Sequence, residues 1–189
     1  MHPPMAIVRH LTLTELEAGL DYIRQSPNNG GELQLIVRRP AVDERETVND
    51  AALCVNSGLV GDTWSSRGSS RTEDGAPHPD MQLNIMNARA AALIAETPDR
   101  WALAGDQLYV DLDLSGDNLP PGARLEVGAA IIQVTDQPHT GCNKFVARMG
   151  RDAMRLVNSP VGRSLNLRGI NARVVHSGAI RVGDLLVKL

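Results

Sequence analysis

The second half of the chain is divided into short segments of strand-like sequence, each ended by residues that favour a turn. Apolar residues alternate with other residues through 107–114, and further short apolar segments follow at 130–135, 172–176, 179–182 and 185–189. Ser177-Gly178 and Gly183-Asp184 separate the last three segments. Short strands at close spacing, with few helical patterns between them, are typical of antiparallel barrels. The sequence therefore predicts a mainly β fold with a few helices, arranged as a β-barrel.

A helix is expected near the start of the chain. Thr14 followed by Glu17 has the form of a capping box, and apolar residues recur at helical spacing in Leu13, Leu16, Leu20 and Ile23. Because an apolar stripe usually faces a core, we expect this helix to pack on the barrel. The predicted organisation is an N-terminal helical extension over residues 1–31 and a barrel domain over residues 32–189.

The region that follows mixes strand, loop and helix patterns. Residues 32–38 predict a strand, the charged segment 43–50 a loop or short helix, and the Ala-rich segment 87–96 a helix with Asn87 as its N-cap. Residues 65–80 are rich in Ser, Arg, Gly and Pro, and so long a loop is uncommon in a compact domain. This loop is either a solvated excursion or a lid or binding loop that carries Arg67 and Arg71.

Composition argues against several classes of partner. The net charge is -3, and only two Trp, two Tyr and one Phe are present, which disfavours phosphate neutralisation and base stacking. No apolar run is long enough to span a bilayer, and the first residues lack the pattern of a signal peptide. We therefore expect a cytoplasmic protein with reduced thiols and with neither nucleic-acid nor membrane partners.

Cys142 lies in the segment with the most chemical content, residues 136–145. A strand is expected to end near Thr135 and a helix to begin near Asn143, so Cys142 would lie at a helix N-terminus. Backbone N–H groups there favour a thiolate, and His139 and Lys144 could add to that effect. A thiolate is both a nucleophile and a soft metal ligand.

Each of these residues also has a structural interpretation. A single Cys is often a small buried hydrophobe, and Cys54, in an apolar segment, is expected to belong to the core. His139 could orient a ligand or tune the thiol, or it could be a solvated loop residue. No second His or acid lies at zinc-ligand spacing, and neither a phosphate-binding P-loop nor a nucleophile elbow is present.

Several arginines fall in or beside predicted loops. If they converge near Cys142 they would form an anion pocket, because guanidinium groups bind phosphates well. The alternative is that they are scattered surface charges. The residues in question are Arg67, Arg71, Arg163, Arg168 and Arg173.

A set of motifs in fixed order resembles the MOSC domain family, named after the C-terminal domain of molybdenum cofactor sulfurase. The set consists of the Gly-x-x-Gly-Asp segment 58–62, the strand and helix start at 82–88, the Pro-Gly-x-x-Leu-x-Val-Gly turn at 121–128, the Pro-containing loop that leads to Cys142, and the closing segment LRGINARVVHSGAIRVGD at 167–184. The matches extend from about residue 32 to the C-terminus. One motif departs from the pattern, since Gly105-Asp106-Gln107-Leu108 stands where many relatives have Gly-Glu-Asn-Leu.

The resemblance implies a MOSC-type β-barrel whose Cys142 acts as metal ligand and catalytic residue toward a molybdenum cofactor (molybdopterin). The residues it suggests for cofactor binding are Asp62, Arg67, His139, Thr140, Asn143, Arg168 and Arg173. The implied activity is the reduction of N-oxygenated small molecules with electrons from a redox partner. The alternatives are a cofactor-free sulfur carrier, with a persulfide on Cys142 and a sulfur donor protein, or a binding module. The pyridoxal-phosphate domain of full-length sulfurases is missing, so no pyridoxal phosphate is expected.

Overall fold

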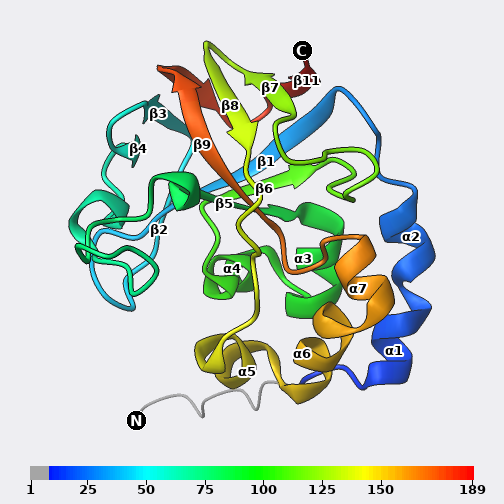
Figure 1. Cartoon of the computed structure of the whole chain (residues 1–189). Helices are drawn as coiled ribbons and strands as arrows, with labels where there is room; N and C mark the ends of the chain where they lie inside the picture. Colours follow the sequence, from blue (N-terminus) through cyan, green and yellow to red (C-terminus); the bar gives the residue numbers. More distant parts are fainter. Residues whose placement is uncertain (1–8) are drawn as a thin grey trace, which may run out of the picture.

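Seven strands of the described part of the chain close into a barrel, which confirms the predicted fold class (Figure 1). The computed structural model describes residues 9–189. Around the ring the strands are β1 (Gly31–Arg38), β6 (Leu108–Asp111), β5 (Leu83–Asn87), β9 (Ile170–His176), β8 (Ala130–Val134), β7 (Arg124–Val127) and β11 (Leu185–Lys188). The ring closes where Gly31 and Glu32 of β1 pair with β11. The β5–β6 pair is parallel, and the other pairs of the ring are antiparallel.

A second, three-stranded sheet lies beside the barrel. It consists of β10 (Gly178–Arg181), β3 (Asp50–Cys54) and β4 (Gly58–Leu59). The prediction of a loop or short helix over 43–50 was wrong for its second half, because β2 (Glu46–Val48) pairs with residues 36–38 of β1. The charged sequence there is compatible with an edge strand, whose stability comes from pairing with β1 more than from its own propensity.

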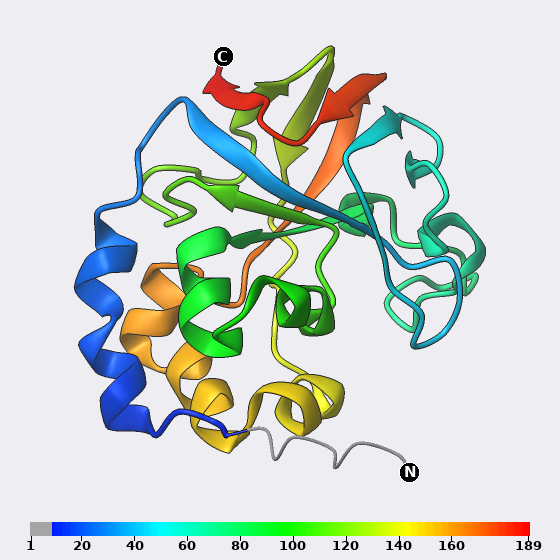
Figure 2. The same cartoon turned by 180° about the vertical axis from the view of Figure 1, so that it is seen from behind.

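Helices cover one end and side of the barrel (Figures 1 and 2). They are α1 (Leu13–Ala18), α2 (Leu20–Arg24), α3 (Ala88–Ala95), α4 (Pro98–Trp101), α5 (Asn143–Met149), α6 (Arg151–Asn158) and α7 (Pro160–Ser164), with short 3₁₀ turns η1 (Trp64–Ser66), η2 (Pro79–Met81) and η3 (Ala102–Ala104). Asn87 caps α3 as predicted, since its side chain accepts from the N–H of Ala90. No helix within residues 9–189 has the length and apolar character that a membrane crossing requires.

The N-terminal helical region packs against other helices of the molecule. Helix α1 lies against α6 and helix α2 against α3. The capping box is two residues earlier than predicted. The Thr12 side chain accepts from the backbone N–H of Glu15, and the Glu15 carboxylate accepts from the backbone N–H of Thr12. Residues 1–8 of the predicted extension lie outside the described residues.

Two apolar cores share the strands of the barrel. Along β6, Leu108 and Val110 face the barrel interior, whereas Tyr109 between them faces the helices. This is the alternation that a pleated strand imposes. The interior core draws on the other strands of the ring, and the outer core includes Leu16, Ile23, Phe145 and Leu156 from the covering helices. Burial on both faces fixes the ends of β1, β5 and β6, where the polar residues of the site lie.

One connection crosses between the barrel and the helices. Residues 135–141 run from the end of β8 to the start of α5, in yellow at the front of Figure 1, and are called the strap here. Gly141 allows a close approach to α6, since a Cβ atom there would lie 2.3 Å from the Sδ of Met154. The strap thereby leads from β8 to Cys142 at the start of α5.

Candidate functional site

Cys142 opens onto a cavity of about 400 Å³, called the Cys142 cavity here. Its walls come from segments far apart in the sequence: the end of β1 and the loop after it, β5, the segment before β6, the strap and α5. The lining residues are Arg39, Ala41, Val42, Asp43, Arg45, Thr63, Arg67, Asn84, Ala104, Gly105, His139, Thr140, Cys142, Lys144, Phe145, Arg148 and Arg168.

Cys142 is exposed and holds the N-cap position of α5, as predicted. Its carbonyl accepts from the N–H of Val146, so the backbone of this residue is part of the first helical turn. Phe145 and Met149 are buried in the outer core and hold α5 against the molecule. The thiol therefore stands on a fixed element while remaining accessible from the cavity.

Arg39 forms one buried wall of the cavity through a two-pronged ion pair with Asp62. Its Nε and Nη2 donate to the two carboxylate oxygens of Asp62 at 2.7 and 2.9 Å. Burial would raise the pKa of Asp62, but hydrogen bonds and charge from Arg39 outweigh it, so the pKa is lowered and the group stays ionised. The Nη1 of Arg39 donates to Asn84 Oδ1 and to the carbonyl of Gly105. Every donor group of this guanidinium is thus fixed in place.

Arg168 forms a second buried wall together with Asp106 and His139. Asp106 accepts from Nη1 of Arg168 and pairs with Nε2 of His139, both at 2.6 Å. Burial would raise the pKa of Asp106, but the charge of Arg168, and that of His139 once it is protonated at low pH, hold it at about 2. Burial, and then Arg168, lower the pKa of His139. The trio is therefore a carboxylate, a guanidinium and a neutral imidazole.

Gly169 allows this trio to form at the start of β9. Its φ of +112° lies in the region that favours glycine. A Cβ atom there would lie 2.3 Å from the carbonyl oxygen of Ile85 and 2.9 Å from the ring of His139. The close approach keeps the imidazole next to the chain that carries Arg168.

The cavity has a strong excess of positive charge. Six lining side chains are cationic, whereas Asp43 is the one carboxylate among the lining residues of this described cavity. Asp43 pairs with both Lys144 and Arg148. The pKa of Arg45 is lowered by burial and by the neighbouring charges of Arg148 and Arg39. These cations repel one another, and an anion in the cavity would relieve that repulsion.

The departure at 105–108 from the Gly-Glu-Asn-Leu motif preserves the chemical groups. Asp106 supplies the buried acid, and the amide of Gln107 accepts from Asn84 N–H at 2.7 Å and donates to the Gln82 carbonyl at 3.0 Å. An acid and an amide are thus both present, each differing from the motif by one methylene. Recognising Asp for Glu and Gln for Asn would have marked this segment from the sequence.

The structure brings together some of the residues predicted for the site and leaves others apart. Those that line the Cys142 cavity are Arg67, His139, Thr140 and Arg168. Asp62 does not line it, because its side chain is buried in the ion pair with Arg39. Asn143 does not line the cavity. Arg173 instead pairs with Asp80 on another part of the surface, and Arg71 lies near Met81. The predicted convergence of arginines therefore holds for two of the five, since Arg163 lines a neighbouring cavity.

Several residues of the site were not identified from the sequence, among them Arg39, Arg45, Asp106 and Arg148. Asp106 has the signal described above, and Arg39 follows a predicted strand directly, where strand ends often carry site residues. Arg45 and Arg148 give no such signal, because their place at the cavity depends on how the loop after β1 and helix α5 fold together.

Cys54 does not belong to the core, contrary to the prediction. It ends β3 and is only partly buried. Hydrogen bonds from the Ser57 hydroxyl and from the N–H groups of Asn56 and Ser57 lower the pKa of its thiol. Its position at the end of the central strand of the small sheet, where a turn follows, explains why an apolar local sequence does not produce burial.

The described residues contain no cluster of three or more His, Cys, Asp and Glu placed to hold a metal ion. Cys142 and the surrounding cations instead form a site with one soft ligand and many groups that bind anions.

Comparisons with known proteins agree with this architecture. The sequence profile of the MOSC domain matches residues 49–187. YiiM from Escherichia coli is similar in structure, with a TM-score of 0.54 and 20% identity over 84% of this chain and 69% of that chain. The YUAD protein from Bacillus subtilis has a TM-score of 0.57 and 15% identity over 82% of this chain and 93% of that chain. YiiM from Geobacillus stearothermophilus has a TM-score of 0.52 and 18% identity, covering 85% and 73%.

At these identities the solved structures share the fold, and no curated protein matches the sequence. The profile match covers well over half of the chain. The chain therefore belongs to the MOSC domain family.

Proposed function

We propose that the Cys142 cavity binds a molybdenum cofactor and that the protein uses it to reduce N-oxygenated small molecules. The observation that carries the proposal is an accessible thiol on the wall of a cavity with six cationic side chains. The family relationship supports the same cofactor, because MOSC domains are associated with it in general.

The donor set fits such a group. A thiolate is a soft ligand suited to molybdenum, and guanidinium groups bind phosphate through paired hydrogen bonds. A cavity of about 400 Å³ is within the range of pockets that hold organic cofactors. The buried Nε of Arg168 has no partner within residues 9–189, which leaves one donor at the wall unsatisfied.

The residues of the cavity would have three different roles toward the cofactor. Cys142 would supply one ligand to the metal, and Arg45 and Arg67 would bind the phosphate, because neither forms an ion pair with a described carboxylate. Arg39 and Arg168 would keep the walls rigid through their buried partners. When bound, the cofactor would supply two-electron chemistry that cleaves an N–O bond with uptake of two protons and release of water. A separate redox partner in the cytoplasm would supply the electrons.

The test is metal analysis of protein made in a host that synthesises the cofactor. We expect about one molybdenum per chain in the wild type and in Cys54→Ser, and a loss of most of it in Cys142→Ser. Cys54→Ser is the matched control, because it removes the other thiol of the chain without touching the cavity. Equal molybdenum in the two variants, or none in the wild type, would contradict the proposal.

A second candidate is a sulfur carrier that holds a persulfide on Cys142. The exposure of Cys142 favours it, since a donor protein must reach the thiol to transfer sulfur. Intact-mass measurement after incubation with a cysteine desulfurase and cysteine would then give a sulfur increment that dithiothreitol removes. The increment should be absent in Cys142→Ser and present in Cys54→Ser, and its absence from both would exclude this candidate.

A further inference from the structure

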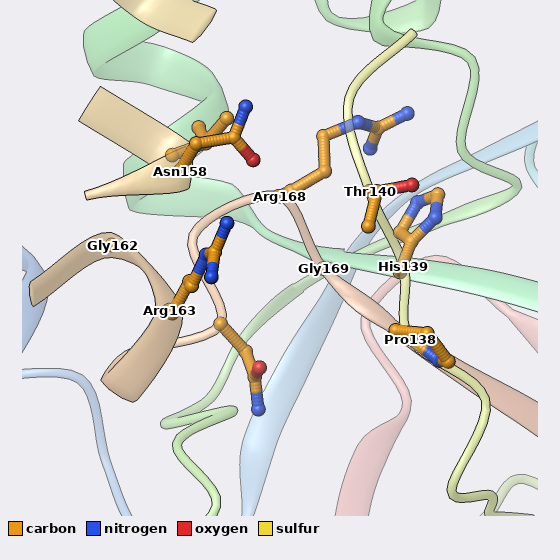
Figure 3. Close-up of a pocket in the computed structure, with 10 residues that line it drawn as sticks. Pro138, His139, Thr140, Asn158, Gly162, Arg163, Arg168 and Gly169 are labelled. Atoms are coloured by element: carbon orange, nitrogen blue, oxygen red, sulfur yellow. The ribbon is translucent and has the colours of Figure 1, made fainter. Parts of the chain in front are cut away.

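A second cavity, of about 370 Å³, lies beside the strap (Figure 3). Asn158 and Arg163, from α6 and α7, lie on one side of it, and Pro138, His139 and Thr140 of the strap lie on the other. Cys142 is not among its lining residues, but His139, Thr140 and Arg168 line both cavities, so the two cavities share a wall.

The charge of this second cavity is positive. Neither Asp nor Glu is among the described residues that line it, whereas Arg163 and Arg168 are. Asp106 compensates Arg168. Arg163 forms no ion pair or side-chain hydrogen bond with any residue of 9–189, so its guanidinium is available to a ligand.

Uncharged polar groups gather around the same space. The amide nitrogen of Asn166 donates to the carbonyl of Leu114, which leaves its Oδ1 free to accept. Asn158 and Thr140 make no side-chain hydrogen bond within the described chain. Two carboxamides can match the alternating donors and acceptors on the edge of a heterocycle, and Val157 and Pro138 add apolar surface for its face.

We propose that this second cavity binds a small organic phosphate that carries a hydrogen-bonding heterocycle, with Arg163 on the phosphate and the two asparagines on the ring. A guanidinium recognises phosphate through two parallel hydrogen bonds, and the cavity volume is sufficient for a nucleotide-sized molecule. The groups assigned to the ligand, Arg163, Asn158 and Asn166, do not line the Cys142 cavity, and their contacts require neither Cys142 nor a metal.

Calorimetric titration with uridine monophosphate tests the proposal. We expect saturable binding with one site per chain, about tenfold weaker binding of uridine, which lacks the phosphate, and a similar loss for uridine monophosphate in Arg163→Gln. Arg151→Gln is the matched control, because Arg151 is an exposed arginine of α6 that does not line this cavity, and it should leave affinity within about twofold.

The same titration in metal-free Cys142→Ser separates this site from the proposed cofactor site. Unchanged affinity is expected there, whatever the outcome of the metal analysis. Absence of saturable binding at millimolar uridine monophosphate, or equal affinity in Arg163→Gln and wild type, would overturn the proposal. Equal melting temperatures of the two arginine variants would verify that a loss of binding does not come from unfolding.

Discussion

The neighbourhoods of Cys142 and Cys54 differ in what surrounds the sulfur. Both thiols are free; Cys54 is the last residue of β3, and Cys142 holds the N-cap position of α5. At Cys54 the groups that lower the pKa of the thiol are uncharged: the hydroxyls of Ser57 and Ser177 and the backbone N–H groups of Asn56 and Ser57. Cys142 shares its cavity with six cationic side chains. Hydrogen bonds make a thiol more acidic, whereas a cationic cavity attracts an anionic ligand, so the two neighbourhoods favour different chemistry.

The ion pairs of the two neighbourhoods differ in the same way. The side chains of Arg39 and Asp62 beside the Cys142 cavity are 8% and 0% exposed. Those of Arg181 and Asp50 in the small sheet, which also contains Cys54, are 73% and 64% exposed. A buried pair fixes its members and is costly to break, whereas an exposed pair contributes little.

The largest effect is expected from breaking the buried pair. Asp62→Ala should lower the free energy of unfolding by about 3–5 kcal/mol, because it leaves the guanidinium of Arg39 buried without its partner. Asp50→Ala, the exposed counterpart, should cost below about 1 kcal/mol. Urea unfolding of both variants measures the difference, and equal losses would remove the contrast between the two neighbourhoods.

Two glycines with positive φ should differ in the cost of an added methyl group, because their surroundings differ. Gly169→Ala should cost about 3 kcal/mol, because it combines a positive φ with a Cβ position 2.3 Å from a backbone oxygen. Gly183, in the turn between β10 and β11, has a φ of +98° with nothing within 4 Å of its Cβ position, so Gly183→Ala should cost only about 1 kcal/mol of strain. Thermal unfolding distinguishes them, and a smaller cost at Gly169 would show that β9 can shift away from Ile85 and His139.

The pH dependence of stability should follow the trio beside the cavity. Since the pKa of Asp106 is about 2 in the folded protein and 3.8 ordinarily, its stabilisation is present above pH 3.8 and is lost as the pH falls toward 2, by about 2 kcal/mol in total. His139 has a pKa below 6.5 when folded, so the unfolded chain binds the extra proton and stability also falls as the pH drops through 6.5. Unfolding free energies measured between pH 7 and 5 should show a smaller slope in His139→Gln, and an unchanged slope would mean that His139 titrates normally.

A smaller effect is expected from removing single charges at the Cys142 cavity. Arg45→Gln or Arg67→Gln should each slow the reaction of Cys142 with an anionic thiol reagent about two- to threefold, because each removes one of six cations. The reaction of Cys54 in the same proteins provides the internal control. Slower reaction of both cysteines would indicate a change in the reagent or the fold rather than in the local field.

Much of the fold follows from local patterns, whereas the site depends on pairing at a distance. The alternation along 107–114 and the apolar stripe of Leu16, Leu20 and Ile23 specify faces, and the structure buries those faces. The placement of α5 directly after Cys142 also follows from the sequence, because Phe145 and Met149 share one helical face. Local sequence does not reveal that β2 pairs with β1, or that β3 ends at Cys54 in a position that leaves this residue partly exposed.

The arginines show why the residues of the cavity could not all be predicted from the sequence. Arg67 and Arg173 were both predicted to bind the cofactor, but the fold places Arg67 at the cavity and pairs Arg173 with Asp80. Arg39 was overlooked because its role depends on a buried ion pair with Asp62. Asp62 lies 23 residues away in sequence, so no local pattern links the two residues. The barrel fold brings these two residues into contact, and no local sequence signal predicts that contact.

The most direct test compares the rates at which the two cysteines react with reagents of opposite charge. Sulfonatoethyl methanethiosulfonate is anionic and trimethylammonioethyl methanethiosulfonate is cationic, and each can be followed by mass in Cys54→Ser and in Cys142→Ser, which retain one thiol each. The anionic-to-cationic rate ratio should be at least about fivefold higher for Cys142 than for Cys54, and should decline with added salt. Equal ratios for the two thiols at low salt would contradict a cationic cavity at Cys142.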